Sequence, residues 1–149
     1  MSLTTNIMTA LKEAMKSKNT VALTALRAVK SAILLAQTET GAKQELTEEQ
    51  ELKILQKQVK QRKDSAAIFL EQGREDLAAP ELAEAEVISK FLPEALSEEE
   101  ITKVVEDVIA KVGADGMKDM GKVMGMVSGK LAGKADGKTI SSIVKSKLS

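Results

Sequence analysis

The sequence predicts an all-α protein, with a helical N-terminal domain followed by a small C-terminal three-helix bundle. Apolar residues recur at spacings of three and four over nearly the whole chain. Capping-box patterns precede two of these segments, and no alternating apolar and polar stretch indicates a strand. The 149 residues are 43% hydrophobic and 30% charged, a composition that supports a packed core beneath a charged surface.

An N-terminal domain over residues 1–92 is expected to hold four helices. Apolar stripes place the first three at about 3–17, 20–37 and 47–73. Thr47 with Gln50 forms a capping-box pattern at the start of the third helix, which is expected to expose Lys53, Lys57, Lys60, Arg62 and Lys63. Arg74 is expected to pair with an acid such as Asp76. Pro80 is expected in the first turn of the fourth helix, where its missing N–H costs nothing.

A domain boundary is expected at the segment KFLPEALS, with a linker at 93–96 and a C-terminal domain over 97–149. Pro93 forces the chain out of the fourth helix. Ser97 with Glu100 is a second capping-box pattern and marks a new helix start. This domain is expected to hold helices at about 98–112, 119–131 and 136–148, with Gly113 ending the first of them.

The residue types that are missing exclude much catalytic chemistry. The chain has no His and no Cys, which rules out Ser-His-Asp and Cys-His catalysis, His metal sites and thiolate metal sites. We therefore expect no catalytic residues, no metal and no cofactor. Phe69 and Phe91 are the aromatic residues, too few for a stacked-ring platform for single-stranded nucleic acid. No apolar run approaches about 20 residues, so no membrane span is expected, and the lack of Cys favours the cytoplasm.

Five glycines recur at every fourth position from Gly121 to Gly137, and four of them precede a lysine. Each glycine inside a helix costs roughly 0.5–1 kcal/mol relative to alanine, so a repeated cost calls for a reason. Gly121, Gly125 and Gly129 would share one helix face. That face could admit a phosphodiester backbone, with the neighbouring lysines as flexible charges, or it could let two helices pack tightly. The sequence pattern by itself favours the second interpretation, close packing of two helices.

Charge is unevenly distributed along a chain whose formal net charge is +0. Residues 116–149 hold seven lysines and two aspartates, whereas residues 84–107 hold eight acids and two lysines. Residues 117–126 contain four methionines, which we interpret as side chains that fill gaps in the core and not as a docking surface. The stretch GKADGKT is not a P-loop, because that motif requires glycine where Ala132 stands.

Four segments together resemble the GatB/YqeY family over essentially the whole chain, and specifically its stand-alone YqeY-like proteins. The segments are LRAVKSAI (26–33), VKQRKDSAAIF with GREDLA (59–78), FLPEALSEEEI (91–101), and DMGKVMG with GKADGKTISSIVK (119–145). The resemblance implies a helical N-terminal domain joined to a small helical bundle. That bundle is similar to the tail of the B subunit of the glutamine-dependent aminoacyl-tRNA amidotransferase, which helps to hold tRNA.

The resemblance implies a tRNA-related binding module without catalysis of its own. The candidate RNA-binding residues are Lys118, Gly121, Lys122, Gly125, Lys130, Gly133, Lys134, Asp136, Gly137 and Lys138. Candidate partners are tRNA and an amidotransferase or aminoacyl-tRNA synthetase. Two alternatives stay open. One is an accessory subunit that contributes to carbon–nitrogen ligase activity with glutamine as amido-N-donor, and the other is a protein-interaction adaptor.

Overall fold

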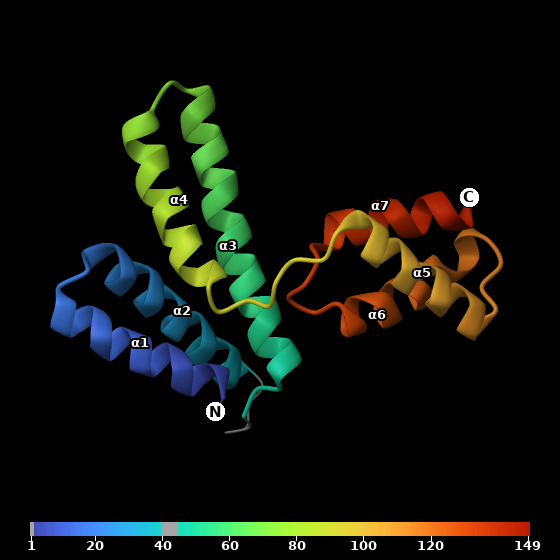
Figure 1. The fold of residues 1–149 in the computed structure, drawn as a ribbon, viewed down its shortest axis with the longest axis horizontal. Helices are drawn as coiled ribbons and strands as arrows, with labels where there is room; N and C mark the ends of the chain where they lie inside the picture. Colours follow the sequence, from blue (N-terminus) through green and yellow to red (C-terminus); the bar gives the residue numbers. More distant parts are fainter. Residues whose placement is uncertain (1, 40–44) are drawn as a thin grey trace. The chain divides into compact units, whose positions relative to one another are not determined.

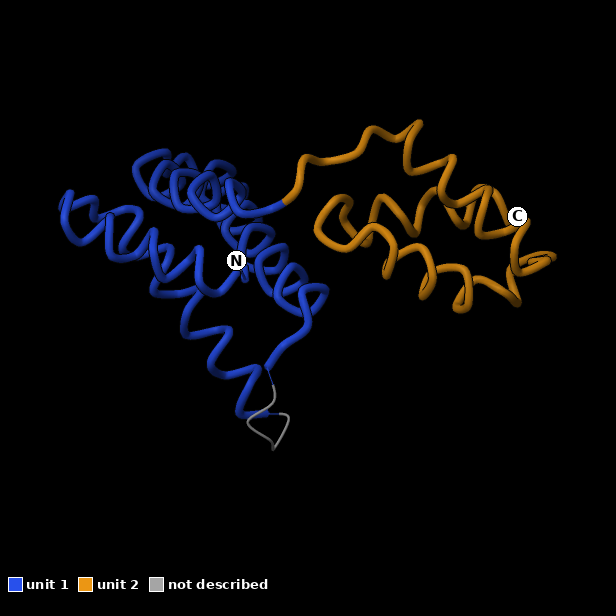
Figure 2. Tube along the Cα trace, turned by 60° about the horizontal axis from the view of Figure 1, so that its bottom comes forward, with its two compact units in different colours: residues 1–92 blue, residues 93–149 orange. Residues whose placement is uncertain are grey.

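The computed structural model describes residues 2–39 and 45–149. Over these residues the protein consists of seven α-helices and one short 3-10 helix, and contains no strand (Figure 1). The predicted all-α class is therefore confirmed. The chain divides into two compact units, unit 1 over residues 1–92 and unit 2 over residues 93–149 (Figure 2). Each unit has a hydrophobic core of its own.

Unit 1 is built from four helices that follow one another as two helical hairpins (Figure 1). They are α1 (Leu3–Ser17), α2 (Thr20–Glu39), α3 (Glu48–Glu71) and α4 (Glu75–Ser89). All four contribute to one core, which consists of Ile7, Leu11, Ala14, Ala22, Ala25, Leu26, Val29, Ile33, Leu55, Val59, Ala85 and Ile88. Residues at helical spacing thus supply the buried face of each helix.

Local hydrogen bonds set both ends of α3, through side chains at its start and through the backbone at its end. The Gln50 N–H donates to Thr47 Oγ1 at 3.2 Å, and the Thr47 N–H donates to Gln50 Oε1 at 2.9 Å, which confirms the predicted capping box. At the other end, Gly73 has φ +71°. The Arg74 N–H donates to the Phe69 carbonyl at 2.7 Å and the Gly73 N–H to the Leu70 carbonyl at 3.0 Å, a Schellman motif.

The prediction for Pro80 is wrong, because α4 begins at Glu75 and Pro80 is its sixth residue. The Schellman turn leads directly into α4, so the helix starts earlier than its apolar pattern suggests. Arg74 precedes α4 and forms the predicted pair with Asp76, at 3.0 Å for both Nε–Oδ1 and Nη2–Oδ2. This bond lowers the pKa of Asp76 and raises that of Arg74.

The expected exposure of Arg62 is also wrong. Its side chain is 13% exposed, because α4 packs along α3 and covers it. Its Nε lies 3.6 Å from Glu84 Oε1, which is an ion-pair distance but too long for a hydrogen bond. No other residue that the structure describes forms a hydrogen bond with this Nε. The Nη1 group donates to Gln58 Oε1 at 2.7 Å. Arg62 thus belongs to the interface between the two helices.

Unit 2 contains α5 (Glu98–Val112), the 3-10 helix η1 (Met117–Asp119), α6 (Met120–Lys130) and α7 (Gly137–Leu148). Its core consists of Ile101, Val105, Val108, Val123, Val127, Leu131, Ile140, Val144 and Leu148. Ser97 Oγ accepts from the Glu100 N–H at 3.2 Å, so the predicted helix start is confirmed. The capping box is only half formed, because the Glu100 carboxylate accepts from Ser97 Oγ at 3.2 Å and not from the Ser97 N–H. Gly113 ends α5 in the left-handed conformation at φ +65°. The start of the predicted sixth helix is a 3-10 turn, so α6 proper begins at Met120.

The turn between α6 and α7 is fixed to the segment that enters α5. The Leu96 N–H donates to the Lys134 carbonyl at 2.9 Å, and Leu96 packs against the core of unit 2. Gly133, which is buried, has φ +78°, a conformation that favours glycine. The backbone that carries Lys134 is therefore held in place while its side chain remains exposed.

Helix α2 is long and apolar enough to cross a membrane, judged by length and composition alone, with a mean hydropathy of 1.3. We expected from the sequence that no apolar segment approaches the length of a membrane span, and α2 shows that this expectation is wrong. A core helix of a soluble protein passes the same test, so the finding is weak evidence for a membrane span. Five residues of α2 lie in the core of unit 1: Ala22, Ala25, Leu26, Val29 and Ile33.

Candidate nucleic-acid interface

One face of α6 presents glycine to open space. Gly121 and Gly125 are exposed, and a Cβ atom built on either would meet no atom within 4 Å. The opposite face is buried, with Val123 and Val127 both 0% exposed. Packing against another helix of unit 2 therefore does not explain these two glycines. Gly129 is exposed as well and lies one helical turn further along.

All seven lysines of residues 116–149 have exposed side chains. Lys147 forms an ion pair with Glu106 of α5, at 2.8 Å between Nζ and Oε1. The other six form no ion pair within the residues that the structure describes, and they are Lys118, Lys122, Lys130, Lys134, Lys138 and Lys145. Lys122 follows the first open glycine of α6, and Lys130 ends that helix. Lys134 lies in the turn between α6 and α7, and Lys138 is the second residue of α7. The positive charge is thus available to a ligand.

Two of the predicted site residues serve the fold. Gly133 is the buried turn residue described above. Asp136 caps α7, because its Oδ1 accepts from the Thr139 N–H at 2.6 Å. That hydrogen bond is the main reason why the pKa of Asp136 is lowered. Gly137, the first residue of α7, is exposed, and a Cβ there would also meet open space.

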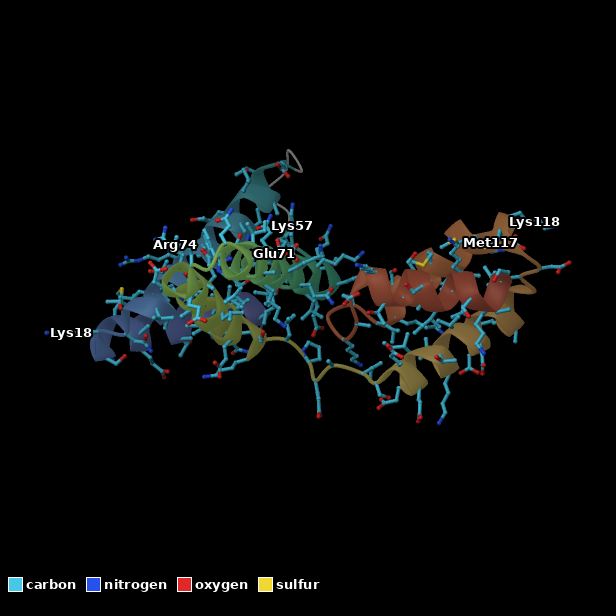
Figure 3. The ribbon with its side chains drawn as sticks, turned by 90° about the horizontal axis from the view of Figure 1, so that it is seen from above. Lys18, Lys57, Glu71, Arg74, Met117 and Lys118 are labelled. Atoms are coloured by element: carbon cyan, nitrogen blue, oxygen red, sulfur yellow. The ribbon has the colours of Figure 1, made fainter. Side chains whose placement is uncertain are left out.

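The methionines of residues 117–126 divide into two groups. Met120, Met124 and Met126 are partly buried and pack against the core of unit 2, which confirms the gap-filling interpretation for these three. Met117 is 44% exposed and projects beside Lys118 (Figure 3). The predicted RNA-binding residue Lys118 therefore stands next to an exposed apolar side chain.

Unit 2 carries opposite charges on different helices. The first turn of α5 holds Glu98, Glu99 and Glu100, all exposed, in the position where acids interact favourably with the helix dipole. The lysines described above lie on η1, α6, α7 and the intervening turn. Six of the eight acids of residues 84–107 thus share unit 2 with these lysines, while Glu84 and Glu86 lie on α4 of unit 1.

A groove between α5 and α7 was not predicted from the sequence. It encloses about 500 Å³ and is lined by Glu98, Thr102, Lys138, Thr139, Ser142, Ile143, Ser146 and Lys147. The signal available in the sequence was the spacing of Lys138, Ser142 and Ser146, each four residues apart and so on one helix face.

Unit 1 holds a buried carboxylate that sequence reasoning also missed. Glu51 is 8% exposed, and its Oε1 accepts from Thr4 Oγ1 at 3.2 Å. Burial raises the pKa of Glu51. It lines a cavity of about 710 Å³ together with Glu45 and Glu48. Among the described residues, no group of three or more carboxylates is placed to hold a metal ion.

The fold and this surface define a small all-helical protein whose C-terminal unit exposes a lysine-rich, glycine-containing face. The chain belongs to the Yqey-like protein family, whose sequence model matches residues 4–148. It is also 40% identical over 108 residues to "Altered inheritance of mitochondria protein 41, mitochondrial" of Clavispora lusitaniae. That match covers 70% of this chain and 61% of the relative, so the chain spans about three-fifths of the relative's length.

Proposed function

We propose that the protein is a tRNA-related binding module without catalysis of its own, and that unit 2 carries the RNA site. The observation that carries the proposal is the open glycine face of α6 beside exposed lysines that form no ion pair in the described chain. A backbone without Cβ atoms lets a phosphodiester chain come close, and ammonium groups neutralise it without reading its sequence. Family membership supports the same interpretation.

We also propose that the compact units act as two domains, a helical N-terminal domain over 1–92 and a three-helix bundle over 97–149, joined at 93–96. If the protein binds tRNA, an amidotransferase or an aminoacyl-tRNA synthetase that acts on the same tRNA is the expected protein partner. We place the protein in the cytoplasm because it lacks cysteine. The name of the relative places that protein in mitochondria, so fractionation of cells that express a tagged chain tests this location.

The RNA site is tested by titrating the full chain with total tRNA and with a duplex RNA of equal length. We expect tRNA to bind more tightly than the duplex. If four lysines neutralise phosphates, affinity should fall about a hundredfold between about 50 and 200 mM salt. Equal binding of both RNAs would remove the claim of tRNA recognition, and no binding at low salt would remove the proposed function.

The lysines are tested by the double substitution Lys122→Glu with Lys130→Glu, which should abolish tRNA binding in a folded protein. A charge-matched control is Lys103→Glu with Lys111→Glu on α5, because both of these side chains are exposed in the same unit. Each pair includes one lysine in the last turn of its helix, so the cost to the helix dipole is similar. Equal loss of binding in both variants would show a dependence on net charge rather than on this site.

A second candidate function is that of a protein-interaction adaptor. It is favoured by large apolar side chains exposed around the turn between α3 and α4, where Ile68 is 54%, Leu70 50% and Leu77 39% exposed. Protein partners that stay bound after nuclease treatment, and are lost on Ile68→Ser with Leu70→Ser, would support this function.

A further inference from the structure

The groove between α5 and α7 has a different chemistry from the glycine face of α6. Its α7 wall offers the hydroxyls of Thr139, Ser142 and Ser146 beside the ammonium groups of Lys138 and Lys147. Its α5 wall offers Glu98 and Thr102. The volume of about 500 Å³ lies within the range of small-ligand sites. The groove therefore combines cations with uncharged groups that can both donate and accept hydrogen bonds.

Two of these hydroxyls are free to bind a ligand. A serine or threonine inside a helix commonly donates to the carbonyl four residues earlier, as Thr102 does to Glu98 at 2.7 Å and Ser89 does to Ala85 at 2.8 Å. Ser142 and Ser146 form no hydrogen bond through their side chains with any described residue. Both are exposed and line the groove. Their donor and acceptor capacity is thus not used by the fold.

These groups are arranged in a row along α7. Lys138, Ser142 and Ser146 are spaced by four residues, so they follow one another on the same face over about 12 Å. Lys147, the second cation of the groove, is already paired with Glu106. Lys138 forms no ion pair with a described residue, although its charge contributes to the lowered pKa of Asp136, so it is the cation of the groove that can still bind an anion directly. A ligand along this row would meet one positive charge and then two hydroxyls.

We propose that the groove holds a ribose–phosphate unit of RNA, and that it lets the protein distinguish RNA from DNA. Lys138 would bind the phosphate, which RNA and DNA share. Ser142 and Ser146 would hydrogen-bond the 2′-hydroxyl, which DNA lacks. Glu98 on the facing helix can only accept hydrogen bonds, which suits a ribose hydroxyl and not a phosphate. This inference rests on the proposed RNA function and adds the part of the nucleotide that is recognised.

The test compares two 12-nucleotide single strands of one sequence, RNA and DNA, bound to the full chain at low salt. The unchanged protein should bind RNA about three- to tenfold more tightly, the effect of one or two hydrogen bonds. Ser142→Ala with Ser146→Ala should bring that ratio near one, while the DNA affinity and the salt dependence stay the same. Lys138→Gln should weaken both ligands equally and lower the salt slope by about one phosphate.

Ser141→Ala is the matched control, because this serine also lies on α7 but does not line the groove. Alanine favours helix more than serine does, so these substitutions should preserve folding, which circular dichroism checks. An unchanged RNA-to-DNA ratio in the double variant, or equal affinities in the unchanged protein, would overturn the inference while tRNA binding through Lys122 and Lys130 could stand. Failure to bind either strand or tRNA would overturn both proposals.

Discussion

Gly125→Ala should make unit 2 more stable. Gly125 is the sixth residue of α6 and lies in the helix interior, where glycine costs roughly 0.5–1 kcal/mol relative to alanine. The added methyl group would meet no atom within 4 Å, so no steric cost offsets the gain. We therefore expect the free energy of unfolding to rise by about 0.5–1 kcal/mol. For a unit of this size that corresponds to a rise of about 2–8 °C in Tm.

The assay is native-state hydrogen exchange of the Val123 and Val127 amides, which reports on α6 separately from unit 1. Gly113→Ala and Gly116→Ala are the controls, because φ is +65° and +96° at these positions and a side chain there is strained. Both should lower stability. A loss of stability in Gly125→Ala would show that another surface covers this face, and would refute the reasoning.

The same substitution separates stability from function. If the open face of α6 receives a phosphodiester backbone, the methyl group of Gly125→Ala occupies the space that the ligand needs. The variant should therefore bind tRNA more weakly although it is more stable. Unchanged tRNA affinity would place the RNA contact on the lysines alone.

Three further predictions concern packing and charge. Asp136→Ala should cost about 1 kcal/mol and Asp136→Asn much less, since asparagine also caps a helix. The pKa of Asp136 in the folded protein lies below its ordinary value of 3.8. The stabilisation by its carboxylate should therefore be complete above pH 3.8 and be lost as the pH falls through the folded pKa. Acid titration of both variants checks this. Burial raises the pKa of Glu51 from 4.5, so the charged carboxylate is disfavoured in the folded protein. Glu51→Gln should therefore stabilise the folded protein at pH 7. Urea unfolding at several pH values should show this gain shrinking as the pH falls toward 4.5. Ile140→Ala, at a site 2% exposed, should cost about 2–5 kcal/mol and remove exchange protection from α5, α6 and α7, while the amide of Ile33 in unit 1 keeps its protection.

Local chemistry made several helix boundaries predictable. Thr47 and Ser97 cap α3 and α5 because their hydroxyls reach the N–H three residues on, an interaction contained within four residues. Gly113 adopts the left-handed conformation for which glycine is best suited. Pro80 was misplaced because the start of α4 depends on the turn formed by Gly73 and Arg74, and an apolar pattern does not register that turn.

The sequence identified the lysines of the candidate site, but it did not determine how the helices around them are arranged. Spacing alone placed Gly121 and Gly125 on one face of α6, but whether that face packs or lies open depends on where the other helices of unit 2 run. The ion pair of Arg62 with Glu84 joins residues on different helices, and so does the hydrogen bond of Thr4 to Glu51. The groove between α5 and α7 likewise depends on how two helices pack. Such relations are set by tertiary structure, which a periodic pattern does not encode.

The interior position of Pro80 has a consequence for the order in which unit 1 opens. Proline has no N–H, so the Asp76 carbonyl lacks the hydrogen bond that residue 80 would otherwise donate. The first turn of α4 is thus tied less firmly to the rest of the helix, next to the turn at Gly73. We expect the α3–α4 hairpin to begin its unfolding at this turn, with the hydrogen-bonded amides of Ala78 and Ala79 exchanging before those of 84–89.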